Sequence, residues 1–124
     1  MFTRETGLDA LAISVGNVHL QQDRQGGLDE VRLRAIEAVT SVPLVIHGGS
    51  GVPIAQRVHL ARWSNICKFN IGTELRMAFG AALRQAVNSD PTRFDRLQIL
   101  QETHATLVAA TRTVLRAISA KTRL

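Results

Sequence analysis

The sequence of 124 residues contains no tyrosine and only one cysteine, and aromatic residues make up 4% of it. The single cysteine, Cys67, cannot form an internal disulfide, so we expect a reducing, cytoplasmic environment. No apolar run reaches the length of a membrane span, and the first residues do not resemble a signal peptide. These absences favour a single cytoplasmic domain with one hydrophobic core and no membrane partner.

The net charge is +5, and much of the positive excess lies near the end of the chain, in Arg112, Arg116, Lys121 and Arg123. Because aromatic residues are scarce and no nucleic-acid-binding motif is recognised, we expect no nucleic-acid partner. A solvated helix face accounts for these charges more simply. A basic surface would also attract a phosphorylated metabolite.

Apolar segments with a strand pattern alternate along the chain with segments of helical period. The first nine residues show no clear element. Strands that alternate with helices are typical of an α/β protein with a parallel sheet and right-handed crossovers. We expect strands over residues 10–18, 43–46 and 66–71, and helices over residues 28–39, 53–63, 73–87 and 92–120.

Each predicted helix has an apolar face that we expect to be buried. Thr73 is expected to cap the helix over residues 73–87, and Asn65 to adopt left-handed geometry after the helix over residues 53–63. The faces, in chain order, are Leu28, Val31, Ala35, Ile36 and Val39; Ile54, Val58 and Ala61; Leu75, Phe79, Ala82, Leu83 and Ala86; and Leu100, Leu107, Val114 and Ile118.

The stretch over residues 43–53 has the clearest functional pattern in the sequence. Its apolar run is typical of a strand buried on both faces, and a helical pattern begins at Pro53. Between them lies a glycine-rich turn whose N–H groups could approach an anion such as phosphate, just before a helix N-terminus. The alternative is a tight βα turn with a buried, hydrogen-bonded histidine. The turn consists of His47, Gly48, Gly49, Ser50 and Gly51.

Polar or small residues open the loop after each of the three predicted strands. Because the carboxyl ends of parallel strands meet at one edge of a sheet, we expect these residues to lie close together. They are Asn17 and His19 after the first strand, His47 to Ser50 after the second, and Asn70, Gly72 and Thr73 after the third.

Four segments match one family pattern in order and spacing: residues 6–12, 16–19, 43–53 and 68–79, with a weaker element at residues 90–93. Together they resemble the class II, metal-dependent ketose-bisphosphate aldolases, the fructose- and tagatose-bisphosphate aldolase family. The resemblance implies a TIM barrel, of which residues 1–124 would form a single partial domain. This domain would be α/β, with the last three βα units of the barrel and the C-terminal helices.

By this resemblance, His19 and His47 match two of the three histidines that hold a catalytic Zn²⁺. The zinc ion would polarise the ketose carbonyl during the reversible cleavage of a ketose bisphosphate to dihydroxyacetone phosphate and an aldehyde. The chain would then be a cytoplasmic lyase of carbohydrate metabolism, and its substrate a phosphorylated sugar. The residues that match the substrate- and phosphate-binding loops are Gly48, Gly49, Ser50, Asn70, Ile71, Gly72 and Thr73.

The chain departs from the family pattern in places that matter for catalysis. It has no match to the early histidine-x-aspartate-histidine motif, which carries the catalytic aspartate and the first zinc ligand, so no catalytic residue is assigned here. Leu20 stands where the family has glycine after the second zinc histidine, and it would either crowd the substrate phosphate or turn outward. His59 and His104 match no ligand position, and we expect them to be structural or solvent-facing.

Two functions from different classes remain open, and a basic nucleic-acid-binding domain is a third and weaker alternative. The first is the C-terminal portion of a class II aldolase, which forms a homo-oligomer or is completed by a missing N-terminal half. The second is a non-catalytic, truncated paralogue that acts as a phosphate-binding or association module. Because no matched residue supplies a general acid or base, we expect no aldolase turnover by the chain alone.

Overall fold

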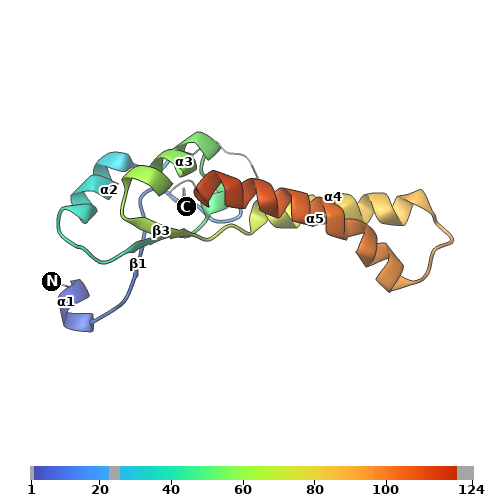
Figure 1. Ribbon diagram of the computed structural model, residues 1–124, viewed down its shortest axis with the longest axis horizontal. Coiled ribbons are helices and arrows are strands. Elements are labelled where there is room, and N and C mark those ends of the chain that lie inside the picture. Colours follow the sequence, from blue (N-terminus) through green and yellow to red (C-terminus); the bar gives the residue numbers. More distant parts are fainter. Residues whose placement is uncertain (1, 23–25, 120–124) are drawn as a thin grey trace.

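A three-stranded parallel sheet lies at the centre of the computed structural model, which describes residues 2–22 and 26–119 (Figure 1). The strands β1 (Leu11–Ile13), β2 (Leu44–Ile46) and β3 (Ile66–Phe69) are ordered β1-β2-β3. Leu44 of β2 pairs with Leu11 on one side and with Ile66 on the other. The predicted parallel α/β architecture is therefore confirmed.

The first predicted strand is much shorter than expected. Gly16 adopts a φ of 89°, and the Val15 carbonyl accepts a hydrogen bond from the Asp29 N–H at 2.8 Å rather than from a strand. The prediction of a strand over residues 10–18 was wrong beyond Ile13, because the chain leaves the sheet there. Asn17 and His19 consequently lie in a loop above the end of β1.

The helices α2 (Glu30–Glu37) and α3 (Ile54–Trp63) connect the strands and lie on one side of the sheet (Figure 1). The Asp29 side chain caps α2 by accepting the Arg32 N–H at 2.9 Å. α3 ends at Trp63 as predicted but begins at Ile54, because Pro53 precedes the helix as its N-cap. A short helix, α1 (Phe2–Thr6), occupies the start of the chain, where no element was expected.

Two long helices form an antiparallel arm that extends beyond the sheet (Figure 1). α4 (Thr73–Ser89) leads outward from the end of β3, and α5 (Arg96–Ile118) returns alongside it until its C-terminal end meets α3 and β3. The predicted break between the two helices is confirmed. The prediction that the last helix reaches Ala120 lies outside the described residues, as do Lys121 and Arg123.

The hydrophobic core fills the space between the sheet and the helices α2 and α3. Its members come from the strands, the loops and these two helices, and none comes from the arm. The nine buried residues are Ile13, Val15, Leu28, Leu33, Leu44, Ile46, Val52, Leu60 and Ile66.

The buried faces of the helices differ in part from those predicted. At α2, Leu33 is completely buried whereas Val31 and Val39 are 83% and 78% exposed. The predicted face was therefore right for Leu28 and Ile36, which lie in or against the core, and wrong for the two valines. In the arm, Ala82 and Ala86 are buried as expected, but Leu100 is exposed. The buried residues of α3 are Arg57, Leu60 and Ala61, of which only Ala61 was predicted.

Two local predictions about helix ends were also wrong. Thr73 is the first residue of α4 and makes no capping bond. The N-cap position is occupied instead by Gly72, with a φ of −135°. Asn65 does not adopt a positive φ. Its side chain instead donates hydrogen bonds to the carbonyls of Ser41 and Val42, at 3.3 and 3.0 Å, and so joins the turn before β2 to the start of β3.

Candidate functional site

The glycine-rich turn after β2 is held tightly against the loops that follow β1 and β3. Gly48 has a φ of 65°, and a Cβ atom there would overlap the carbonyl oxygen of Val18. The Gly49 N–H donates to the Asn70 carbonyl at 2.9 Å, and a Cβ at Gly49 would lie 3.1 Å from that oxygen. Both glycines are therefore required for the close approach of the three loops.

Asn17 fixes the loop after β1 to the end of β2. Its amide nitrogen donates to the His47 carbonyl at 3.1 Å, and its Oδ1 accepts the Val15 N–H at 2.8 Å. These two hydrogen bonds of Asn17 bring the residues after Gly16, including His19, next to His47. The ring centroids of His19 and His47 lie 5.7 Å apart, with the planes tilted by 50°.

Asn70 approaches the edge of the His47 ring. Its amide nitrogen lies 3.2 Å from Nδ1 and 3.2 Å from Nε2 of His47. The backbone N–H of Asn70 donates to the Ile46 carbonyl at 2.8 Å, which continues the pairing of β2 and β3 and fixes the position of this residue. Asn70 is thus placed to orient the His47 imidazole through a side-chain hydrogen bond.

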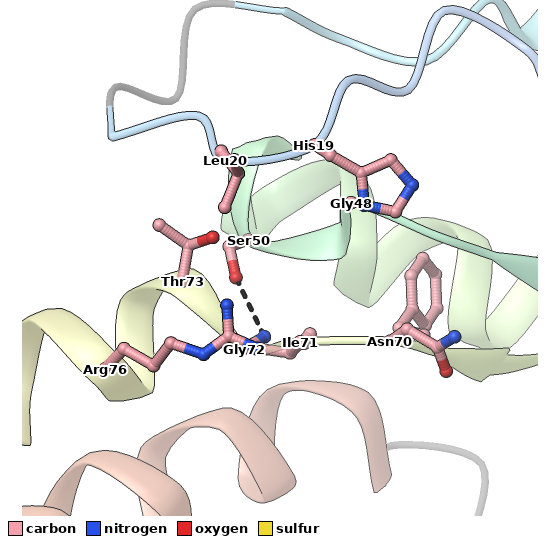
Figure 2. Close-up of a pocket in the computed structure, with 10 residues that line it drawn as sticks. His19, Leu20, Gly48, Ser50, Asn70, Ile71, Gly72, Thr73 and Arg76 are labelled. Carbon is pink, nitrogen blue, oxygen red and sulfur yellow. Dashed lines mark hydrogen bonds between the residues drawn. The ribbon is translucent and has the colours of Figure 1, made fainter.

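The Ser50 hydroxyl joins the glycine-rich turn to the beginning of α4. Ser50 is buried, and its Oγ accepts the N–H groups of Gly72 at 3.2 Å and Glu74 at 3.3 Å. These donors belong to the first turn of a 17-residue helix, where N–H groups have no partner within the helix. Figure 2 shows the Ser50 side chain directed toward Gly72, with Thr73 and Arg76 beside it.

The loops that follow the three strands line a cavity of about 490 Å³ (Figure 2). Most of the residues predicted from the sequence line it, together with three others, Leu20, Phe69 and Arg76. Two predicted residues are not among the lining: Gly49, which packs against Asn70, and His47, whose ring lies 5.7 Å from that of His19. The lining consists of His19, Leu20, Gly48, Ser50, Phe69, Asn70, Ile71, Gly72, Thr73 and Arg76.

Arg76 is the cationic member of this lining, and the sequence analysis missed it. It lies four residues after Gly72, and its guanidinium extends back over the start of α4 (Figure 2). Residues four apart share one face of a helix, so the spacing from Gly72 could have identified it.

Leu20 forms part of the wall above Ser50 and Thr73 (Figure 2). Its φ is 60°, a left-handed conformation that suits glycine, and its side chain is 73% exposed. The loop thus keeps a backbone conformation suited to glycine although leucine occupies the position. Leu20 also borders a second cavity of about 500 Å³ that runs along α4 between Gln22 and Arg84.

The histidine pair satisfies part of the requirement for a zinc site. Two imidazoles that share a zinc ion at about 2.0–2.1 Å per bond have ring centroids no more than about 6.5 Å apart. The separation of 5.7 Å between His19 and His47 is compatible with that geometry. Within residues 2–22 and 26–119, however, no group of three His, Cys, Asp or Glu residues is positioned to hold a metal ion.

The other two histidines lie outside this cavity. His59, on α3, is exposed and its Nε2 lies 3.8 Å from a carboxylate oxygen of Glu30, while His104 is exposed on α5. None of the helices in the described part of the chain is long and apolar enough to cross a membrane.

A parallel β/α sheet with a glycine- and serine-rich turn, two histidines and a helix N-terminus at one end defines an α/β protein with a polar pocket at the carboxyl ends of its strands. The chain belongs to the fructose-bisphosphate aldolase class-II family, whose pattern it matches over residues 1–123. This confirms the family resemblance of the sequence.

Among solved structures, the chain is similar to the crystal structure of the YdjI aldolase from Escherichia coli K12. The two sequences are 27% identical and the TM-score is 0.72. The match covers 97% of this chain but 42% of the YdjI chain, so this chain spans less than half the length of that relative.

Proposed function

We propose that this chain forms the phosphate-binding side, and part of the metal-binding side, of a class II aldolase site. The reaction would be the reversible cleavage of a ketose bisphosphate to dihydroxyacetone phosphate and an aldehyde. The supporting observation is one cavity lined by His19, Ser50, the start of α4 and Arg76, with the His47 ring 5.7 Å from that of His19. Its substrate is then a phosphorylated sugar of cytoplasmic carbohydrate metabolism.

The phosphate group of the substrate would bind at the start of α4. The backbone N–H group of Thr73 and the positive end of the helix dipole favour an anion there, beside Gly72, whose own N–H donates to Ser50. The Thr73 hydroxyl can donate a further hydrogen bond, and Arg76 supplies a positive charge on the same wall of the cavity. Gly48 allows the backbone to approach the three-carbon end of the substrate, beside Ile71, and Gly49 holds this turn against Asn70.

His19 and His47 would hold a zinc ion together with a third ligand from outside the described residues. When bound, the ion supplies Lewis-acid polarisation of the substrate carbonyl. Asn70 would turn its amide oxygen toward an N–H of His47, which leaves the other ring nitrogen free as a ligand. The same amide can hydrogen-bond a substrate hydroxyl.

The rest of the catalytic machinery would come from further βα units. In this proposal residues 1–124 correspond to the last three βα units of a TIM barrel, and the general acid/base and third zinc ligand belong to the units before them. They are supplied by a longer N-terminal half or by an associated chain. The match to 42% of the YdjI chain supports this assignment.

A titration with inorganic phosphate, followed through the backbone amide signals of Gly72 and Thr73, tests the phosphate site. We expect both signals to shift, and the variant Arg76→Met to weaken binding about tenfold, as is typical when a hydrogen bond to a charged group is lost. Arg84→Met is the matched control, because Arg84 lies on α4 outside this cavity. Equal effects of the two variants would contradict the assignment.

A second candidate function is phosphate binding or association without catalysis. The lack of a third potential metal ligand near His19 and His47 within the described residues favours it. Zinc competition against a colorimetric chelator separates the two functions, with His47→Ala and His59→Ala as the matched pair. Tight zinc binding that only His47→Ala abolishes supports the aldolase site, and no zinc binding with intact phosphate binding supports the second function.

A further inference from the structure

Arg57 is a completely buried arginine beneath the proposed phosphate site. It belongs to α3, and its side chain is 1% exposed. Its Nη1 and Nη2 donate to the two carboxylate oxygens of Glu74 at 3.0 and 3.1 Å, which is the two-bonded arrangement that arginine forms with carboxylates. Its Nε has no partner among the described residues. A charged residue is seldom buried so deeply.

Glu74 connects this ion pair to the cavity. It lies in the first turn of α4, and its N–H donates to the same Ser50 hydroxyl that accepts the Gly72 N–H. Its carboxylate points away toward Arg57 and does not line the cavity. The ion pair therefore joins α3, which follows the glycine-rich turn, to the beginning of α4.

The direction of the Glu74 carboxylate matters for anion binding. A carboxylate in the first turn of a helix interacts favourably with the same dipole that would attract a phosphate, so the two anions compete for one positive potential. The bound guanidinium neutralises this carboxylate and holds it against Arg57 of α3, away from the cavity lining. A hydrophobic pair of similar volume would often stabilise the fold as well or better, so stability alone does not account for the pair.

We propose that Arg57 is a positioning residue for the phosphate site: it holds the Glu74 carboxylate out of the cavity and cancels its charge, so that the start of α4 accepts a phosphate dianion. This inference rests on the proposed function, because it concerns the same phosphate site. According to this inference, phosphate affinity depends on the charge of Glu74 and not on the packing of Arg57.

The test compares inorganic phosphate binding, measured through the Gly72 and Thr73 amide signals, in wild type and three variants. Arg57→Met should weaken binding by at least roughly tenfold, because the Glu74 carboxylate, no longer neutralised, then repels the phosphate from the start of the same helix. Arg57→Met with Glu74→Gln should restore the affinity to within about twofold of wild type. Arg62→Met removes the same charge from an exposed position of α3 and should change little.

Suppose that wild type binds phosphate normally but the double variant binds as weakly as Arg57→Met. This result would overturn the present inference alone and indicate that Arg57 has a packing role. An unshifted wild type would overturn the proposed phosphate site and this inference together. If thermal melting shows that Arg57→Met does not fold, Glu74→Gln alone decides the question. Its affinity should equal or exceed that of wild type, and a loss of affinity would contradict the role of charge.

Discussion

Leu20 shows at the scale of one residue how a substitution can leave a backbone conformation unchanged. Its φ of 60° is the only positive value at a non-glycine position among the described residues. The sequence analysis considered crowding of the phosphate or rotation outward. The structure shows a largely exposed side chain that still borders the cavity, on a backbone that suits glycine.

Replacing Leu20 by glycine should stabilise the protein. A left-handed conformation costs a branched residue about 1–2 kcal/mol, and the larger entropy of glycine in the unfolded chain offsets part of this, so we expect a gain of about 0.5–1 kcal/mol. Urea denaturation measures the difference. Leu20→Ala is the control, because alanine retains the Cβ atom that causes the strain. Equal stability of the two variants would contradict the strain.

The sequence predicted which residues meet where a strand end positions them. His19 and His47 come together because they follow neighbouring parallel strands, and Ser50, Gly72 and Thr73 meet for the same reason. Arg76 and Arg57 could not be predicted in this way. Their positions depend on how α4 leaves the sheet and how α3 packs beneath it, which strand periodicity does not determine.

At the scale of elements, α2 shows why a helical pattern does not by itself identify the buried face. The predicted face combined Val31 and Val39, which are exposed, with Ile36, which packs against the core, and it left out Leu33. Helical spacing alone permits either choice. Only the tertiary structure shows that Leu33 packs in the core, because the rotation of the helix is set by its packing on the sheet.

Substitutions on the two faces of α2 should differ strongly. Leu33→Ala removes a completely buried side chain and should destabilise the protein by about 2–5 kcal/mol, whereas Val31→Ala, at an exposed position, should change stability by less than about 0.5 kcal/mol. Chemical denaturation of both variants under the same conditions measures this difference. Comparable losses of stability in the two variants would mean that the side of α2 with Val31 is also buried.

The turn between α4 and α5 carries a carboxylate with a lowered pKa. The hydroxyl and the backbone N–H of Thr92 both donate to Asp90, at 2.7 and 3.0 Å, and these bonds hold the pKa of Asp90 below its ordinary value of 3.8. A lowered pKa in the folded state means that ionised Asp90 stabilises the turn above its ordinary pKa. This contribution is lost as the pH falls below 3.8 through the folded value.

Asp90→Asn should therefore lower the melting temperature slightly at neutral pH and not at strongly acidic pH. The effect is small because Asp90 is exposed to solvent. Melting curves of wild type and Asp90→Asn across this pH range measure it, with Asp9→Asn as a control at an exposed carboxylate. A difference that stays constant down to strongly acidic pH would show that the Thr92 bonds do not depend on the charge.

At the scale of the whole molecule, the sheet leaves two unpaired edges, β1 and β3, among the described residues. Large apolar side chains are also exposed around it, including Val31, Val39 and Trp63. Exposed apolar surface and open strand edges both favour association. Neither property follows from composition, since a hydrophobic content of 45% is ordinary for a globular domain.

We expect the purified chain to self-associate as its concentration rises. Sedimentation velocity over a range of concentrations measures the association, and the double variant Val31→Lys with Val39→Lys should remain monomeric to higher concentration. Arg34→Lys, on the same helix and without loss of apolar surface, is the control. A wild type that is monomeric at the highest soluble concentration would contradict this expectation.

The absence of core residues from the arm has a consequence for local unfolding. The buried positions of α4 are only Ala82 and Ala86, and that of α5 is Thr103, whereas β2 is packed between Leu33, Leu60 and the strands beside it. Little apolar area holds the outer ends of α4 and α5 together, so the arm should open without unfolding of the sheet. Amide protons near Ala86 and Thr103 should thus exchange with solvent deuterium well before those of Val45 and Ile46.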